Sequence, residues 1–223
     1  MEFKFSLLAA DTSRSRIYLK ALQINKLLPN YVILLDNINK ETTDKLPGQI
    51  NNDCDLEIII KNLKLPYEIA NTKNINSDKA VDLIKKLNEE IVIYSGYGGG
   101  ILREKILSTN KKFLHVHGGY LPDFKGSTTN YYSLLSEKNL GASSIFLTSD
   151  IDGGPVLIRK KFKKPKDCKN IDHETDSFLR AEVLVETLKM LKNGKIDIKK
   201  FNNQGNMYYI IHPVLKHIAM LAK

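Results

Sequence analysis

The chain has 223 residues, 42% of them hydrophobic, which is enough for one large domain with a substantial core. It holds no apolar run near the roughly 20 residues that a membrane span requires, and its apolar N-terminal patch is too short for a signal peptide, so we expect no membrane partner. The net charge of +9 could suit nucleic acid, but the lysines are dispersed and no nucleic-acid motif is present, so we expect a small anionic substrate instead.

The first half of the chain alternates strand-like with helix-like segments. Apolar or β-branched runs predict strands at residues 3–10, 31–36, 65–70 and 90–96. Helices are predicted at residues 13–28 and after Ser77, which can cap a helix. The apolar positions of this second helix have helical spacing: Ala80, Leu83, Ile84 and Leu87. The alternation predicts an α/β fold, a Rossmann-like and mostly parallel sheet with helices on both faces.

The second half of the chain has a different pattern. Residues 141–149 and 154–162 read as two strands, joined by a tight "DIDGG" turn in which glycine supplies a positive φ. A long helix is expected over residues 174–191, with Gly194 as its stop. We expect a catalytic domain over residues 1–195 and a short C-terminal extension, residues 196–223, that packs on it.

Two stretches rich in glycine or histidine follow predicted strands, residues 96–100 and 115–126. Ligands of a parallel sheet bind beyond the carboxyl ends of its strands, so we expect both stretches to line one cleft. The segment "YSGYGGGIL" lacks the lysine and the Ser/Thr of a nucleotide-triphosphate loop. It indicates only that the backbone passes close to a ligand or to another strand.

His115 and His117 are two residues apart in a predicted strand and therefore share one face. A metal site would need a third ligand at a suitable spacing, and neither the other histidines nor Cys54 and Cys168 provide one, so we expect no metal. The two cysteines also form no disulfide framework, which fits a reducing cytoplasm. Polarisation of a carbonyl and movement of a proton remain, and histidine with aspartate suits both.

Two aspartates occupy the predicted turn of the second half. Turn aspartates usually bond their own backbone, and we expect this of Asp150. Asp152 lies between Ile151 and Gly153, just before a new strand, and we expect its side chain to point into the cleft.

The segment "LHVHGGYLPDFKG", followed by "GASSIFLTSDIDGGPVL", resembles the signature region of the folate-dependent formyltransferases. That family includes glycinamide ribonucleotide transformylase, methionyl-tRNA formyltransferase and the sugar N-formyltransferases. The resemblance covers about residues 91–162. It implies the formyltransferase fold, and transfer of a formyl group from 10-formyltetrahydrofolate to an acceptor amine.

By this resemblance, His117 occupies the position of the catalytic histidine and Asp152 that of the catalytic aspartate. His115 stands where the family has a catalytic asparagine, and we expect it to replace that residue as a donor to the oxyanion. Two neighbouring imidazolium ions would repel, so the histidine pair should titrate as a coupled unit. The Pro-Ser that usually follows the catalytic histidine is Gly118-Gly119 here.

The resemblance also implies binding residues. The folate site is expected to be lined by Tyr97, Gly98, Ile101, Leu102, Asp150, Ile151 and Gly153. Lys125 and Gly126, at the family's Arg/Lys-Gly pair, are expected at the acceptor. Ser13, Arg14 and Arg16 begin a predicted helix and could bind a phosphate, since helix N-termini and guanidinium groups favour anions. The alternative is a plain helix cap with solvated arginines.

The length leaves no room for the C-terminal barrel of methionyl-tRNA formyltransferases, and the tail "GNMYYIIHPVLK" resembles the C-terminal hairpin ending of some sugar N-formyltransferases. We therefore expect an amino-sugar acceptor, either linked to a nucleotide or a precursor of a surface polysaccharide. The alternatives are the glycinamide ribonucleotide of purine synthesis, and a non-catalytic protein that binds folate or a sugar nucleotide. A homodimer is compatible with each of these.

Overall fold

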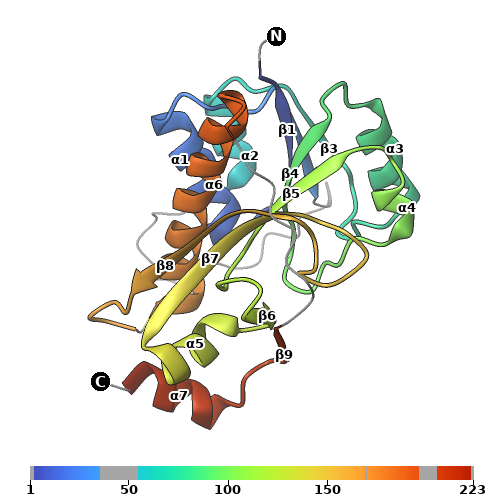
Figure 1. The fold of residues 1–223 in the computed structure, drawn as a ribbon. Helices are drawn as coiled ribbons and strands as arrows, with labels where there is room; N and C mark the ends of the chain where they lie inside the picture. The colour runs from blue at the N-terminus through green and yellow to red at the C-terminus, as the bar shows by residue number, and fades with distance from the viewer. Residues whose placement is uncertain (1–2, 36–54, 169, 196–204, 222–223) are drawn as a thin grey trace, which may run out of the picture.

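The computed structural model describes residues 3–35, 55–168, 170–195 and 205–221 (Figure 1). A seven-stranded sheet forms its centre, in the order β3-β2-β1-β4-β5-β7-β8. The strands of this sheet are β1 (Phe5–Ala10), β2 (Tyr31–Leu35), β3 (Tyr67–Ile69), β4 (Ile91–Ser95), β5 (Lys112–His117), β7 (Asn139–Phe146) and β8 (Val156–Lys163). The five strands from β3 to β5 pair in parallel, whereas β7 and β8 pair antiparallel. The predicted mostly parallel sheet is confirmed.

Helices cover both faces of the sheet, as Figure 1 shows. On one face lie α1 (Ser13–Ile24), α2 (Leu56–Asn62) and α6 (Asp176–Lys192), and on the other lie α3 (Asp78–Lys86) and α4 (Glu104–Leu107). The strands supply both cores by alternation: Leu7 and Ala9 of β1 pack under α1 and α6, and Leu8 and Ala10 pack under α3. The parallel strands are therefore buried on both sides.

The predicted helix signals have physical counterparts. The hydroxyl of Ser77 accepts a hydrogen bond from the backbone N–H of Ala80 and caps α3 as expected. Thr12 does the same for α1 through the N–H of Ser15. Helix α6 follows a single π-helical turn, Ile171–Thr175, and Gly194 beyond its end has φ 63°, as its predicted stop requires.

The connection between β7 and β8 differs from the prediction. It spans residues 147–155 and is therefore longer than a tight turn. The left-handed conformation belongs to Asp152, with φ 51°, instead of to a glycine. Gly154 serves close packing, because a Cβ there would overlap the carbonyl oxygen of Phe146. Aspartate tolerates this backbone better than most residues do, so the loop can present a carboxylate at its sharpest bend.

The C-terminal tail packs on the end of the sheet near α5 (Thr129–Glu137). Its strand β9 (Asn206–Tyr208) pairs in parallel with the short β6 (Phe124–Gly126), and its helix α7 (Pro213–Leu221) contacts α5 (Figure 1). The expected hairpin ending is wrong, because the tail turns into a helix at Pro213, a residue well suited to a first helical position. Among the described residues, no helix is long and apolar enough to cross a membrane.

Candidate active site

A cleft of about 730 Å³ opens beyond the carboxyl ends of β1, β4 and β5. Tyr97, Leu102 and Leu147 on one side pack against the core beneath α3 and α4. Tyr131 and Ile171 on the other side belong to the apolar cluster under α5 and α7. The histidines of β5 lie on the floor together with Arg14, so the cleft has the position expected for the ligand of a parallel sheet.

His117 is held at both ring nitrogens. Its Nε2 lies 2.8 Å from the carbonyl oxygen of Phe124. A carbonyl only accepts, so Nε2 carries a proton and donates it. Its Nδ1 lies 3.4 Å from Oδ1 of Asp152. Burial lowers the pKa of His117, whereas the Asp152 carboxylate acts in the opposite direction. Attraction between Nδ1 and the carboxyl group requires a proton between them, so the two side chains form a proton-holding pair.

Asp152 is held by β6, the short strand that pairs with β9 of the tail. Its Oδ2 accepts a hydrogen bond of 2.8 Å from the backbone N–H of Gly126. Gly126 has φ 97°, and a Cβ there would run into the carbonyl oxygen of Tyr208 in β9. Only glycine fits this position without displacing the tail, so the N–H that holds Asp152 depends on a glycine.

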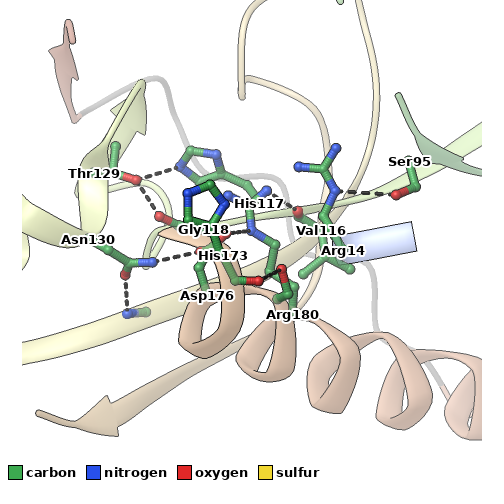
Figure 2. Close-up of polar contacts among 12 residues, drawn as sticks. Arg14, Ser95, Val116, His117, Gly118, Thr129, Asn130, His173, Asp176 and Arg180 are labelled. Atoms are coloured by element: carbon green, nitrogen blue, oxygen red, sulfur yellow. Dashed lines mark hydrogen bonds and ion pairs between the residues drawn. The ribbon is translucent and has the colours of Figure 1, made fainter. Parts of the chain in front are cut away.

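Two arginines, Arg14 and Arg180, line the cleft with His117 (Figure 2). Arg14 donates from Nε to Oγ of Ser95 at 3.2 Å, and from Nη2 to the carbonyl oxygen of Gly96. Burial and the nearby charge of Arg180 lower the pKa of Arg14. Among the described residues, its hydrogen-bond partners are thus neutral groups at the end of β4, and the charge that affects its pKa most is that of Arg180, which has the same sign. A partly buried cation in this setting favours an anionic ligand.

Arg180 also lines the cleft, and its charge is paired with that of Asp176 (Figure 2). Its Nε forms an ion pair of 2.7 Å with Oδ2 of Asp176, and its Nη1 donates to the carbonyl oxygen of Val116 at 3.1 Å. Burial opposes the charge on Arg180, but Asp176, Tyr18 and Asp152 together outweigh burial and raise the pKa of Arg180. Asn130 completes the group, because its Nδ2 donates to Oδ1 of Asp176 at 2.8 Å. The hydrogen bond from Arg180 to Val116 joins α6 to β5, the strand that carries both histidines.

Steric constraints explain why the two residues after His117 are glycines. A Cβ at Gly118 would overlap the guanidinium of Arg180 and the carboxylate of Asp176. A Cβ at Gly119 would lie 2.6 Å from Nε2 of His117. The Gly-Gly pair therefore leaves room for the buried ion pair and for the bond that orients the histidine.

The cleft brings together most of the residues predicted for the site. Those that line it are His115, His117, Asp152, Arg14, Gly126, Tyr97, Gly98, Ile101, Leu102, Asp150 and Ile151. The residues outside its lining are Ser13, Arg16, Lys125 and Gly153. Arg16 instead pairs with Asp11 at 2.8 Å, because residues two apart on a helix point in different directions. Lys125 is buried beside Gly126, since neighbours in a strand face opposite sides.

The sequence analysis did not predict the residues that α5, α6 and the tail contribute to the cleft. The additional lining residues include Thr129, Asn130, Asp176, Arg180, Tyr208, Tyr209 and Ile210. The one signal available for the ion pair was an acid and a base four residues apart, on a helix that is otherwise apolar on that side. Within the described part of the chain, no group of three or more His, Cys, Asp or Glu side chains could hold a metal ion.

The known proteins to which this chain is similar are formyltransferases. A methionyl-tRNA formyltransferase from Caldanaerobacter subterraneus is 30% identical over 148 residues, which are 64% of this chain and 47% of that protein. The chain spans about half the length of the curated relatives it matches. An N-formyltransferase from Helicobacter canadensis, solved in complex with folinic acid and dTDP-3-aminofucose, has a TM-score of 0.64 at 15% identity, covering 93% of this chain and 71% of its own.

A phosphoribosylglycinamide formyltransferase from Anaplasma phagocytophilum has a TM-score of 0.64 at 14% identity, covering 95% of this chain and 100% of its own. These structural likenesses concern the fold. A family model described as formyl transferase matches residues 40–183, well over half of the chain. With its parallel sheet and the His117–Asp152 pair at the sheet's carboxyl edge, this chain belongs to the formyl transferase family.

Proposed function

We propose that this chain transfers a formyl group from 10-formyltetrahydrofolate to the amine of a small anionic acceptor. The proposal rests on the pair of buried His117 and partly buried Asp152, in which Nδ1 and Oδ1 are 3.4 Å apart in an open cleft. Formyl transfer needs a charge-stabilising donor and a proton carrier at one point. A proton held between an imidazole and a carboxyl group supplies both.

The folate side of the cleft is proposed to be the part between α4 and the loop of residues 147–152. Tyr97 and Leu102 offer apolar surface there, and Ile101 and Ile151 are large exposed apolar side chains at its rim. The volume of about 730 Å³ is in the usual range for pockets that bind small molecules. The folinic acid in the Helicobacter protein supports a folate donor for a chain of this fold.

The acceptor side is proposed to be the part formed by Arg14, the start of α5 and the tail. Arg14 has no ion-pair partner among the described residues, and its charge favours a phosphate or another anion. Tyr209 and Ile210 of the tail line the same side and are 78% and 81% exposed, so they offer surface to a ligand larger than an amine. We infer a catalytic domain over residues 1–195 whose acceptor side is completed by the extension 196–223.

An amino sugar linked to a nucleotide fits these features and is the acceptor we propose. We further propose that the enzyme is cytoplasmic. The dTDP-3-aminofucose in the Helicobacter protein supports it. A phosphoribosylglycinamide acceptor is the second candidate, because the Anaplasma protein is covered over its whole length. The sequence relatives are methionyl-tRNA formyltransferases, so an aminoacyl-tRNA belongs in the test as well.

The test is a transfer assay with 10-formyltetrahydrofolate and separate acceptors: dTDP-amino and UDP-amino sugars, glycinamide ribonucleotide, and methionyl-tRNA. We expect formylated product from an amino-sugar nucleotide, and loss of product in the His117→Asn variant. Product from glycinamide ribonucleotide or from methionyl-tRNA alone would reassign the acceptor. Folate binding without product from any acceptor would instead support a non-catalytic binding protein.

A further inference from the structure

The ring of His115 is bonded from one side only. Its Nδ1 lies 3.2 Å from the carbonyl oxygen of Tyr94. Because a carbonyl accepts and never donates, the proton of a neutral His115 ring is on Nδ1. A neutral imidazole has a single N–H, so Nε2 presents a lone pair. Within the described part of the chain no residue hydrogen-bonds Nε2, and His115 lines the cleft.

The surroundings of His115 keep it neutral. The groups that face it are Arg14 from α1, Arg180 from α6 and His117 from its own strand. Burial and the two arginines hold the pKa of His115 well below 6.5, and the Tyr94 carbonyl only partly opposes them. A group of this kind stays uncharged at neutral pH, so its cleft-facing nitrogen accepts hydrogen bonds and does not donate them.

The same strand end fixes His115 and Arg14 as neighbours. Tyr94 holds the imidazole, and the next two residues of the chain, Ser95 and Gly96, hold the guanidinium. The arginine charge disfavours an ammonium ion on this floor, whereas the imidazole lone pair attracts the N–H of an uncharged amine. Together they favour the nucleophilic form of an acceptor.

We infer that His115 is the hydrogen-bond acceptor for the attacking amine of the acceptor substrate, opposite in polarity to the oxyanion donor expected at this position. This inference rests on the proposed formyl transfer. The observation behind it is geometric: Nδ1 of His115 is directed to the Tyr94 carbonyl, no described residue bonds Nε2, and the residue lines the cleft.

The resulting division of labour balances the reaction. The amine nitrogen forms a bond to the formyl carbon, and the bond from that carbon to N10 of the donor breaks. The proton lost by the amine passes to Nε2 of His115. The proton held between His117 and Asp152 stabilises the developing oxyanion and passes to the departing nitrogen. Each turnover leaves His115 protonated and the His117–Asp152 pair deprotonated, and exchange with water in the open cleft restores both.

The first test measures the tautomer and does not depend on activity. Long-range nitrogen–proton NMR on protein labelled with ¹⁵N-histidine, assigned with a His115→Leu variant, reports which ring nitrogen carries the proton. We expect a protonated Nδ1 and an unprotonated Nε2, with the ring neutral at pH 6.5. A protonated Nε2, or an imidazolium ring at that pH, would overturn the inference even if the chain is an active formyltransferase.

The second test measures catalysis with whichever acceptor the wild-type protein uses. His115→Ala should lower kcat/KM for that acceptor by about 100-fold or more, with unchanged binding of 5-formyltetrahydrofolate as the check on folding. His115→Asn retains an acceptor oxygen and should keep more of the rate. Added imidazole should rescue His115→Ala in proportion to its free base, rising with pH through about 7.

Rescue that follows the imidazolium form instead would assign a donor to this position and contradict the inference, as would a wild-type rate in His115→Ala. Absence of formylated product from the wild-type protein is a separate failure. It would remove the proposed function, and the NMR result would still report the polarity of the His115 ring.

Discussion

Replacing Asp152 by asparagine should abolish most of the transfer activity without disturbing the fold. Asparagine has the shape of aspartate, tolerates the φ of 51° at this position, and can still accept the bond from the Gly126 N–H. What it lacks is the charge opposite Nδ1 of His117. The variant therefore removes the ability of the pair to hold a proton and leaves its positions intact.

The magnitude follows from the separation of the two groups. Unit charges 3.4 Å apart attract by about 5 kcal/mol at an effective dielectric constant of about 20. At about 1.4 kcal/mol per tenfold in rate, the full value sets a ceiling of between three and four decades. Only part of the charge on His117 develops in the transition state, so we expect kcat/KM to fall by about 10² to 10⁴.

The assay compares kcat/KM of the Asp152→Asn variant with that of Asp123→Asn, which removes the same charge from an exposed neighbour of β6 outside the cleft. Thermal unfolding and binding of 5-formyltetrahydrofolate are measured in parallel. We expect a loss of kcat/KM in Asp152→Asn only, with thermal stability and folate binding preserved in both variants. A kcat/KM within tenfold of wild type for Asp152→Asn would show that the pair is not the proton carrier.

Three further predictions address the supports of the site. Gly126→Ala should lower the free energy of unfolding by about 2 kcal/mol or more, because φ 97° is strained for alanine and its Cβ meets a backbone carbonyl. Urea titration measures this loss, with Gly98→Ala as the control, because a Cβ at Gly98 has open space. Arg14→Gln should raise KM for an anionic acceptor about tenfold or more, whereas Arg16→Gln, whose guanidinium pairs with an aspartate outside the cleft, should not. The free energy of unfolding should fall as the pH drops below 6.5, because His115 binds a proton in the unfolded chain but not in the folded one, where its pKa is lowered. In urea titrations, His115→Leu should reduce the slope of this pH dependence by up to about 1.4 kcal/mol per pH unit.

The fold followed from the sequence because local patterns repeat along it. Buried strands alternate with capped helices. The Ser77 cap can be predicted because the hydroxyl and the N–H that it binds are only three residues apart. The strands β6 and β9 could not be found in this way, because three residues show no periodicity and their partners are about eighty residues apart. The sequence pattern placed the left-handed residue of the β7–β8 connection at a glycine, whereas it is Asp152, whose side chain bonds the distant Gly126.

The site divides along the same line. His117 and Asp152 were found because a motif fixes their spacing, whereas Arg180 reaches the floor from α6, more than sixty residues away in the chain. Arg14 and Arg16 look alike in sequence, and only packing decides that one lines the cleft and the other pairs with an aspartate. The polarity of His115 likewise depends on a backbone carbonyl of another strand.

The measurement that tests the account most directly follows the formyl carbon itself. 10-Formyltetrahydrofolate labelled with ¹³C in the formyl group is incubated with the wild-type protein and the amino-sugar nucleotides of the panel, and the products are identified by NMR. We expect a labelled N-formyl sugar with the wild-type protein and no such product with Asp152→Asn. Labelled formate or unchanged donor, with no labelled amide on any acceptor although folate is bound, would contradict it.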